Sequence, residues 1–210
     1  MSTILVFCAH PDDEILGVGG TIAKYTKEGK RVICIMFTSG ESSHPWLHKR
    51  DIHAIRQQEA KQAGSEVGVE QTIFLSLRDG LLQKDAPQAH ERLLAIIEKY
   101  TPEKIFTHDI DDIHPDHKAV YHAVTKAVDA YAKPVDVYTF TVWFLAFRKK
   151  ESPKLVIDIT PTFTQKYKAL KHFKSQWLAL VQLVPILYIK SFLDGLDADS
   201  RYAEIFYKIR

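Results

Sequence analysis

The chain has 210 residues, 46% of them hydrophobic, which is enough for one domain with a full core and too little for two ordinary cores. Its 28 basic and 26 acidic residues leave a net charge of +2, so charge gives no reason to expect binding to nucleic acid or to an anionic membrane. The two cysteines, Cys8 and Cys34, lie in apolar runs, which indicates buried thiols in a reducing compartment rather than a disulfide.

Short apolar runs alternate with helical patterns along the first two thirds of the chain. The apolar runs predict strands at Ile4–Cys8, Val32–Phe37, Thr72–Leu75, Lys104–Thr107 and Val135–Val142. Helical spacing and glycine stops predict helices at Ile22–Glu28, about Lys49–Val67, Gln88–Tyr100 and about Pro115–Tyr131. This alternation predicts right-handed βαβ crossovers and a mostly parallel sheet with helices on both faces, a Rossmann-like α/β fold.

The pattern changes after Trp143. A strand is predicted at Leu155–Ile159 and a helix at Thr162–Trp177, followed by irregular structure up to Arg210. Neither a repeat nor a Pro/Gly/Ser-rich linker divides the chain. We therefore expect a single domain over residues 1–210, with a Rossmann-like core at about 1–143 and a C-terminal extension at about 144–210.

No segment has the pattern of a targeting signal or a membrane span. The apolar run at residues 4–9 is short and has no basic residues before it. The longest apolar tract, Trp177 to Ile189, is interrupted by Gln182 and Pro185 and is shorter than the roughly 20 residues that cross a bilayer. These features predict a cytoplasmic protein without a membrane span.

Two dense clusters of histidine and carboxylate follow the first and the fourth predicted strands. The first reads His10-Pro-Asp-Asp-Glu14, and the second, THDIDDIHPDH, ends at His117. In a doubly wound sheet of strand order 3-2-1-4, strands 1 and 4 are neighbours at the point where ligands bind. The two clusters are therefore expected to face each other, although they are more than ninety residues apart in the sequence.

A divalent cation resolves the repulsion among so many carboxylates. Mixed His/Asp ligands with one open position are typical of a catalytic zinc site rather than a structural one. His10 and Asp13, three residues apart at a strand-to-helix turn, can both point into the crevice. His114 and His117 are three apart at a helix start, so that one can bind the metal while the other faces the substrate. Pro115 between them suits the first turn of a helix.

Other chemistries fit less well. The glycines at 17, 19 and 20 do not have the GxGxxG spacing of a dinucleotide loop, and we expect them to allow close helix-to-sheet packing. The acidic turn stands where such a loop would bind pyrophosphate. The sequence also has neither a Walker lysine pattern nor a GxSxG nucleophile elbow.

These motifs resemble the PIG-L-like (LmbE-like) family of zinc-dependent N-acetylglucosaminyl deacetylases. AHPDDE after the first strand and HPDH after the fourth are the specific matches. Supporting matches in the same order along the chain are Arg56-Gln-Gln-Glu59, Arg78-Asp79-Gly80-Leu81, His172-Phe-Lys-Ser175-Gln176 and Tyr202-Ala-Glu-Ile-Phe206. The stretch from Trp177 to Ser200 has no counterpart in the family pattern.

The resemblance implies a role for eight residues. The metal ligands would be His10, Asp13 and His117, with zinc as the metal and iron(II) as an alternative. The catalytic residues would be Asp12 as general base, His114 facing the substrate carbonyl, and Asp116 as the residue that orients an imidazole. Sugar hydroxyls would be held by Arg56 and Asp79.

The chemistry of these residue types agrees with such roles. Zinc lowers the pKa of a bound water towards roughly 7, and Asp12 can take up the proton that the water loses. A protonated His114, its pKa held up by Asp116, would stabilise the oxyanion.

The expected partner is a small N-acetylated sugar such as an N-acetylglucosaminyl malate, an N-acetylglucosaminyl inositol or a chitooligosaccharide. The alternatives are a metal-dependent hydrolase of another ester or phosphoester, and a catalytically silent sugar- or nucleotide-binding domain. The oligomeric state, a homo-oligomer included, is left open.

Overall fold

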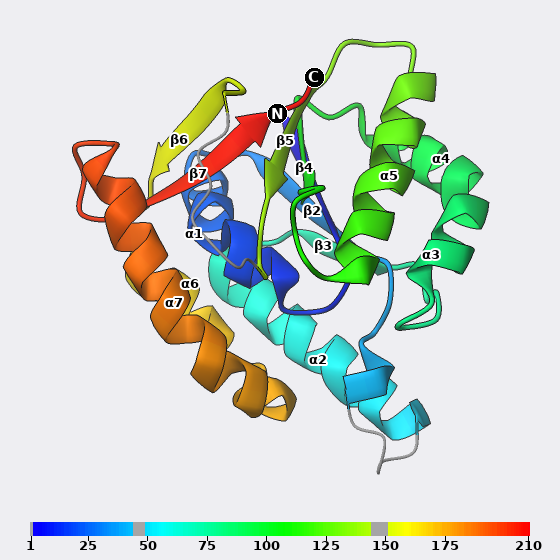
Figure 1. Cartoon of the computed structure of the whole chain (residues 1–210), viewed down its shortest axis with the longest axis horizontal. Helices are drawn as coiled ribbons and strands as arrows, with labels where there is room; N and C mark the ends of the chain where they lie inside the picture. The colour runs from blue at the N-terminus through cyan, green and yellow to red at the C-terminus, as the bar shows by residue number, and fades with distance from the viewer. Residues whose placement is uncertain (1, 44–48, 144–150) are drawn as a thin grey trace.

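A seven-stranded sheet organises the chain in the computed structural model, which describes residues 2–43, 49–143 and 151–210 (Figure 1). The strand order is β3-β2-β1-β4-β5-β7-β6. The strands are β1 Thr3–Cys8, β2 Arg31–Met36, β3 Gln71–Phe74, β4 Lys104–His108, β5 Asp136–Phe140, β6 Lys154–Asp158 and β7 Ala203–Lys208. The first five strands pair in parallel, whereas β7 runs antiparallel to both β5 and β6.

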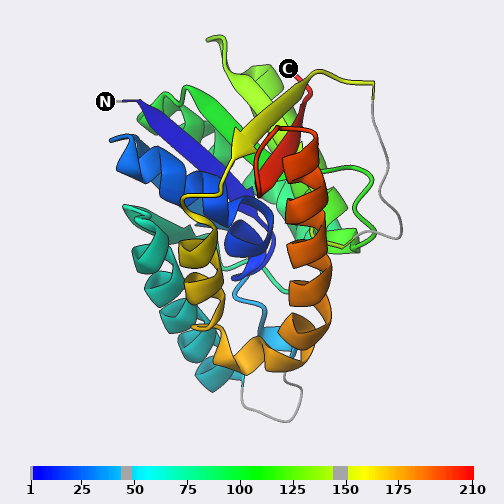
Figure 2. The ribbon, with the colours of Figure 1, turned by 90° about the vertical axis from the view of Figure 1, so that its left-hand side faces the viewer.

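Helices cover both faces of this sheet (Figures 1 and 2). One core cluster lies under α1 Asp13–Lys27, α2 Lys49–Val67, α6 Phe163–Leu170 and α7 Trp177–Leu196. The other lies under α3 Leu82–Asp85, α4 His90–Tyr100 and α5 Pro115–Ala130. Short 3-10 turns are η1 Glu41–Ser43, η2 Ala86–Ala89 and η3 Lys174–Gln176. The predicted fold class and the neighbouring positions of strands 1 and 4 are confirmed.

Helix α1 is longer than the sequence predicts. It starts at Asp13 rather than Ile22, because packing outweighs the low helix propensity of its three glycines. A Cβ at Gly17 would lie 2.2 Å from the ring of Phe140 on β5, and one at Gly20 would lie 2.7 Å from Ile159. The predicted close packing on the sheet is confirmed at Gly17 and, beside the end of β6, at Gly20, whereas Gly19 lies against Lys166 of α6.

The C-terminal part departs most from the prediction. The expected helix at Thr162–Trp177 ends at Leu170, and the expected irregular stretch contains the 20-residue helix α7 and strand β7. Pro185 lies inside α7, although proline removes a helical hydrogen bond. Burial of Leu183 and Leu187 on the inner side of the helix offsets that loss.

The expectation about membrane spans also needs correction. The segment Lys174–Leu196 is a helix that is long and apolar enough to cross a membrane, by length and composition only. Its most apolar 18 residues are 22% buried, so it is not a buried core helix. Gln182 and Pro185, which interrupt the apolar tract in the sequence, do not interrupt the helix. In the structure both are exposed residues of one continuous helix.

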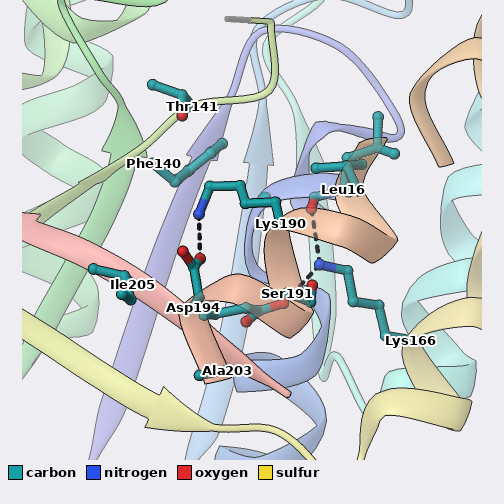
Figure 3. Close-up of a pocket in the computed structure, with 12 residues that line it drawn as sticks. Leu16, Phe140, Thr141, Lys166, Lys190, Ser191, Asp194, Ala203 and Ile205 are labelled. Atoms are coloured by element: carbon teal, nitrogen blue, oxygen red, sulfur yellow. Dashed lines mark hydrogen bonds and ion pairs between the residues drawn. The ribbon is translucent and has the colours of Figure 1, made fainter. Parts of the chain in front are cut away.

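A buried ion pair ties α1 to the C-terminal part of the chain. Lys166 Nζ lies 2.8 Å from Glu204 Oε1. It also donates to the carbonyl of Leu16 at 2.9 Å (Figure 3). The carboxylate of Glu204 accepts from the amides of Gly20 and Thr21 at 3.0 and 2.8 Å. Leu16 and Gly20 are partners in the hydrogen-bond ladder of a regular helix, so the pair holds both ends of one turn of α1.

Glu204→Ala is expected to lower the free energy of unfolding by about 3–5 kcal/mol, because it leaves the ammonium of Lys166 buried and unpaired. Urea unfolding followed by circular dichroism measures this loss. Glu70→Ala is the control, since it removes an exposed pair with Arg31 and should change stability little. Equal stability of the two variants would contradict the role assigned to Glu204.

Candidate metal centre and active site

The first motif forms a strained turn at the carboxyl end of β1. Asp12, just before α1, has φ of 120° and ψ of −30°, a conformation that is costly for a residue with a Cβ. Its amide donates to Glu14 Oε2 at 2.9 Å, and the amide of His10 donates to Asp13 Oδ2 at 2.8 Å. Backbone strain of this kind is concentrated at functional sites, where surrounding contacts hold it in place.

The second motif lies between β4 and α5. The N-cap of α5 is His114, whose Nδ1 accepts from the amide of Asp116 at 3.2 Å, and Pro115 takes the first helical position as predicted. Asp112 fixes the preceding loop by accepting from the amides of His114 at 3.0 Å and Val142 at 2.9 Å. The two imidazoles at positions 114 and 117 are thus presented from one anchored helix start.

The two motifs meet, as the predicted strand order requires. Val6 on β1 pairs with Phe106 on β4, so both strands end at the same edge of the sheet. Asp13 Oδ1 lies 3.4 Å from His117 Nε2, and Asp13 Oδ2 lies 3.5 Å from His10 Nδ1. The three residues expected to bind a metal are therefore neighbours in space.

Their potential ligand atoms belong to overlapping groups. Within the described residues, three sets of side chains place their ligand atoms within 4.8 Å of one another: His10, His114 and His117; Asp13, His108 and His117; His10, Asp79 and Asp116. The expected trio is divided between the first two sets, which share His117. The structure therefore offers one continuous cluster of donors, with His117 where two of the sets overlap.

Opposite charges balance around His117. Burial lowers the pKa of His117, but the negative charges of the nearby Asp13 and Asp112 outweigh burial and raise it to about 9. Burial raises the pKa of Asp13, but the positive charge of His117 and the interactions with His108 and His10 bring it well below its usual value. Without a cation, the proton on His117 compensates the carboxylates, and metal binding releases such protons.

His10 has a similar balance on the more open side of the cluster. Its Nε2 lies 3.0 Å from Asp79 Oδ1 and 3.4 Å from Asp116 Oδ2. Burial lowers the pKa of His10, but hydrogen bonds with Asp116, Asp13 and Asp79 outweigh it and raise the pKa well above its usual value. His10 thus links the acidic turn of the first motif to Asp79 and to the second motif.

Asp12 stands beside the donor cluster without belonging to any of its three sets. Burial raises the pKa of Asp12 to about 6, against the lowering effect of the Arg56 charge. Arg56 is 2% exposed, donates from Nη2 to the carbonyl of Pro11, and lies 3.4 Å from Asp12 Oδ2. Arg56 therefore holds the strained turn as well as the carboxylate of Asp12.

The expectation of a protonated His114, its pKa held up by Asp116, is wrong, because the raising effect of Asp116 is outweighed. The carboxylate of Asp116 accepts from the amides of Gly80 at 2.8 Å and Leu82 at 3.3 Å, and it is the backbone amide of Asp116 that contacts the His114 ring. Burial and the positive charges of His117 and His10 lower the pKa of His114. His114 is therefore a neutral imidazole, with its proton on Nε2 because Nδ1 accepts a hydrogen bond.

Asp79, expected to hold a sugar hydroxyl, joins the cluster. Besides its contact with His10, Asp79 Oδ2 accepts from the amide of Ser42 at 2.7 Å. Burial raises the pKa of Asp79, but the hydrogen bond and charge of His10 outweigh it and bring the pKa to about 2. All eight residues singled out from the sequence thus lie in one connected group.

Two residues of the site carry roles that the sequence did not assign. Asp112 Oδ2 lies 3.0 Å from His117 Nδ1 and so orients the ring. The ring of His108 stacks on that of His117 at 3.8 Å between centroids, and His108 Nε2 accepts from the amide of Ala9. Both residues belong to the second cluster in the sequence, but only the distances single them out among its neighbouring acidic and histidine residues.

Comparison with known proteins identifies the family. The chain matches PIG-L, described as GlcNAc-PI de-N-acetylase, over residues 5–128, which is more than half of its length. The probable N-acetyl-α-D-glucosaminyl L-malate deacetylase 2 of Bacillus cereus is 29% identical over 188 residues, or 85% of this chain and 86% of the relative.

Solved structures share the fold over nearly the whole chain. The N,N'-diacetylchitobiose deacetylase from Pyrococcus horikoshii has a TM-score of 0.83 at 24% identity, covering 99% of this chain and 84% of that one. GalB, the 4-carboxy-2-hydroxymuconate hydratase from Pseudomonas putida, has a TM-score of 0.83 at 19% identity, covering 100% and 97%. Since one is a deacetylase and the other a hydratase, the shared fold alone does not identify the reaction. The match over residues 5–128, which contains both histidine and carboxylate motifs, shows that this chain belongs to the PIG-L family.

Proposed function

We propose that the chain is a hydrolase that removes the N-acetyl group from an N-acetylglucosamine-type substrate. One divalent cation, zinc with iron(II) as the alternative, would be held by His10, Asp13 and His117. The observation that carries the proposal is the meeting of these three side chains, with Asp12 beside them, at the ends of β1 and β4. The deacetylase names of the family and of the Bacillus cereus relative support the reaction and the sugar.

The residues present fit a divalent cation. Two imidazoles and one carboxylate form a donor set typical of a catalytic zinc site. His117 Nε2 is buried and has no hydrogen-bond partner in the part of the chain that the structure describes, so it remains available to a metal. When bound, zinc supplies Lewis acidity, which lowers the pKa of a water towards about 7 and polarises the amide carbonyl.

Asp12 is proposed as the general base. Its carboxylate lies beside the donor cluster, is 9% exposed, and is held by the guanidinium of Arg56. It would accept a proton from the attacking water and then return that proton to the nitrogen of the departing amine. A carboxylate with a raised pKa is suited to both transfers, because its pKa lies closer to neutral pH than that of an ordinary carboxylate.

His114 is proposed to donate a hydrogen bond as a neutral imidazole. The amide of Asp116 holds its Nδ1, which leaves the proton on Nε2 for the oxygen of the substrate carbonyl. This bond would strengthen as negative charge develops on that oxygen. The carboxylate of Asp116 is proposed to position the loop at Gly80 and Leu82, and through it Asp79.

Asp79 remains the proposed contact to a sugar hydroxyl, since it lies on the open side of the cluster next to η1. Arg56 is proposed to act mainly on the protein itself, because it is nearly fully buried and points at Pro11 and Asp12. Any contact of Arg56 with substrate would then take place beside the carboxylate of Asp12.

The proposed unit is a single domain over residues 1–210. Strand β7 supports this organisation, because it lies between β5 and β6 and completes the same sheet as the core at about 1–143. A cytoplasmic location is also proposed, and the free, fully buried thiols of Cys8 and Cys34 support it.

The test is release of free amine from N-acetylglucosaminyl malate, N-acetylglucosaminyl inositol and N-acetylated chitooligosaccharides, with and without a chelator. We expect release from at least one sugar, loss with the chelator and recovery on adding zinc or iron(II). Metal-dependent hydrolysis of an ester or phosphoester alone would contradict the proposal and favour another hydrolase. Sugar binding by calorimetry without any turnover would favour a silent binding domain.

Asp112→Asn is expected to weaken zinc binding about 10- to 100-fold, because a carboxylate that orients a ligand imidazole also raises its basicity. Competition with a chromophoric chelator measures this change in the zinc dissociation constant. Asp111→Asn is the matched control, since it changes the neighbouring carboxylate, which is exposed. Equal zinc affinity in the two variants would remove Asp112 from the site.

A further inference from the structure

Helix α7 lies on the outside of the molecule (Figures 1 and 2), and most of its outward side chains are apolar. Val181 and Leu196 are each 65% exposed, Trp177 is 60% exposed and Leu178 is 57% exposed. No charged side chain occurs from Trp177 to Ile189. Contiguous exposed apolar surface of this extent marks an interaction site, because single-chain soluble proteins seldom expose so much of it.

The face has the spacing of a helix that packs along another helix. Exposed residues recur at alternating intervals of four and three: Leu178, Gln182, Pro185, Ile189, Phe192 and Leu196. Five of these six are apolar, which is the 3.5-residue repeat of a seam between two paired helices. The seam runs along almost the whole length of α7.

The opposite face of α7 is committed to the fold. Leu183 and Leu187 are buried in the core, and a Cβ at Gly195 would lie 2.7 Å from the carbonyl of Ser200. Lys190 pairs with Asp194 on the inner side, where both border a small cavity against α1 and β7 (Figure 3). Crossing a bilayer would require this packing to break and the ion pair to enter hydrocarbon.

The start of α7 is anchored as well. The amide and hydroxyl of Ser175 donate to the carboxylate of Glu59 on α2 at 2.9 and 2.6 Å. The hydroxyls of Tyr188 and Tyr202 lie 2.7 Å apart and tie the middle of the helix to the residue just before β7. The exposed face is therefore held rigidly, which lowers the entropic cost of docking.

Area and charge indicate what covers this face. With about nine large apolar side chains roughly half exposed, the face offers on the order of 800 Å², which is one partner's share of a standard interface. Helices that lie on lipid carry many Lys and Arg residues along the polar flank. On α7 the only cation is Lys190, whose charge is offset by Asp194, and the acidic Asp197 and Asp199 follow its end.

We infer that the α7 face binds the α7 face of a second copy of this chain, forming a two-fold symmetric dimer. In a two-fold interface the same patch serves both subunits, so one apolar seam is sufficient. Ile189 lies near the middle of the helix and is 54% exposed, so its two copies approach each other in the dimer. This inference does not depend on the proposed function.

Sedimentation velocity tests the dimer. The 210-residue chain is expected to sediment as a dimer. Ile189→Glu should raise the dimer dissociation constant at least about 100-fold, because two carboxylates meet in each interface. Ile209→Glu is the matched control, since Ile209 is exposed but lies outside α7. Circular dichroism verifies the fold of each variant. If Ile189→Glu does not fold, Leu178→Glu replaces it as the test of the interface.

Cross-linking gives an independent measurement. Ile189→Cys should form a covalent dimer with a short bis-maleimide, while the parent chain should not, because Cys8 and Cys34 are fully buried. A monomeric parent chain at about 100 μM, or a dimer that survives Ile189→Glu and Leu178→Glu, would overturn the inference. The inference would also be overturned if the parent chain is a monomer that binds neutral phosphatidylcholine vesicles and the Ile189→Glu variant does not bind them.

Discussion

Asp12→Asn is expected to lower kcat by about 10²- to 10⁴-fold, the range that a general base contributes, while the protein keeps its fold and its zinc. Asparagine has nearly the same shape, so it preserves the packing of the strained turn but cannot accept a proton. Steady-state kinetics on the best sugar substrate and elemental analysis of the same preparation measure both properties.

Glu14→Gln is the matched control for this variant. Burial raises the pKa of Glu14 to about 8, so the side chain is mostly uncharged at pH 7 and glutamine resembles it closely. The amide oxygen can still accept from the amide of Asp12, which fixes the turn. We expect kcat close to that of the parent chain, and near-normal turnover in Asp12→Asn would remove Asp12 from the mechanism.

Alanine at His10, Asp13 or His117 is expected to abolish stoichiometric zinc binding. The three donors are neighbours in space, and loss of one leaves too few ligands for a site that must also keep an open position. Elemental analysis after dialysis against zinc gives the bound metal per chain. Each variant is first examined by circular dichroism, because removing one of these groups leaves another buried charge unpaired.

The overlapping donor sets make this series decisive. His108→Ala and His114→Ala are expected to keep stoichiometric zinc, because these residues belong to the two competing sets and not to the proposed trio. Loss of zinc in His114→Ala with retention in Asp13→Ala would favour the set of three histidines. Loss in His108→Ala with retention in His10→Ala would favour the fully buried set.

The Rossmann-like part of the fold could be predicted because its signals are local and strong. Strand β2 reads as an uninterrupted apolar run because it is covered on both faces of the sheet. Apolar residues at helical spacing and a closing glycine predict a helix at about Lys49–Val67, and α2 lies there. The meeting of the two acidic motifs then followed from strand order, since the carboxyl ends of parallel strands share one edge.

The C-terminal part could not be predicted in the same way. The helix around Pro185 forms because Leu183 and Leu187 are buried against distant parts of the chain. Helix propensity describes single residues and does not include the free energy of such burial. The early start of α1 has the same origin, since Gly17 and Gly20 are helical where β5 and Ile159 approach closely. In both places tertiary packing overrides the local signal.

The sequence by itself determined the residue types of the site, the two places where they occur, and the edge of the sheet at which they meet. Only the tertiary structure decided which atoms face each other. Asp112 contacts the His117 ring, the Asp116 carboxylate contacts the His10 ring, and the His114 ring accepts from a backbone amide. The structure also showed that one face of α7 is buried while the other is exposed. Motifs, and the strand and helix patterns from which strand order follows, depend on residues that are close in the sequence. Hydrogen-bond partners and exposure depend on distances below about 4 Å between parts of the chain that are far apart in sequence.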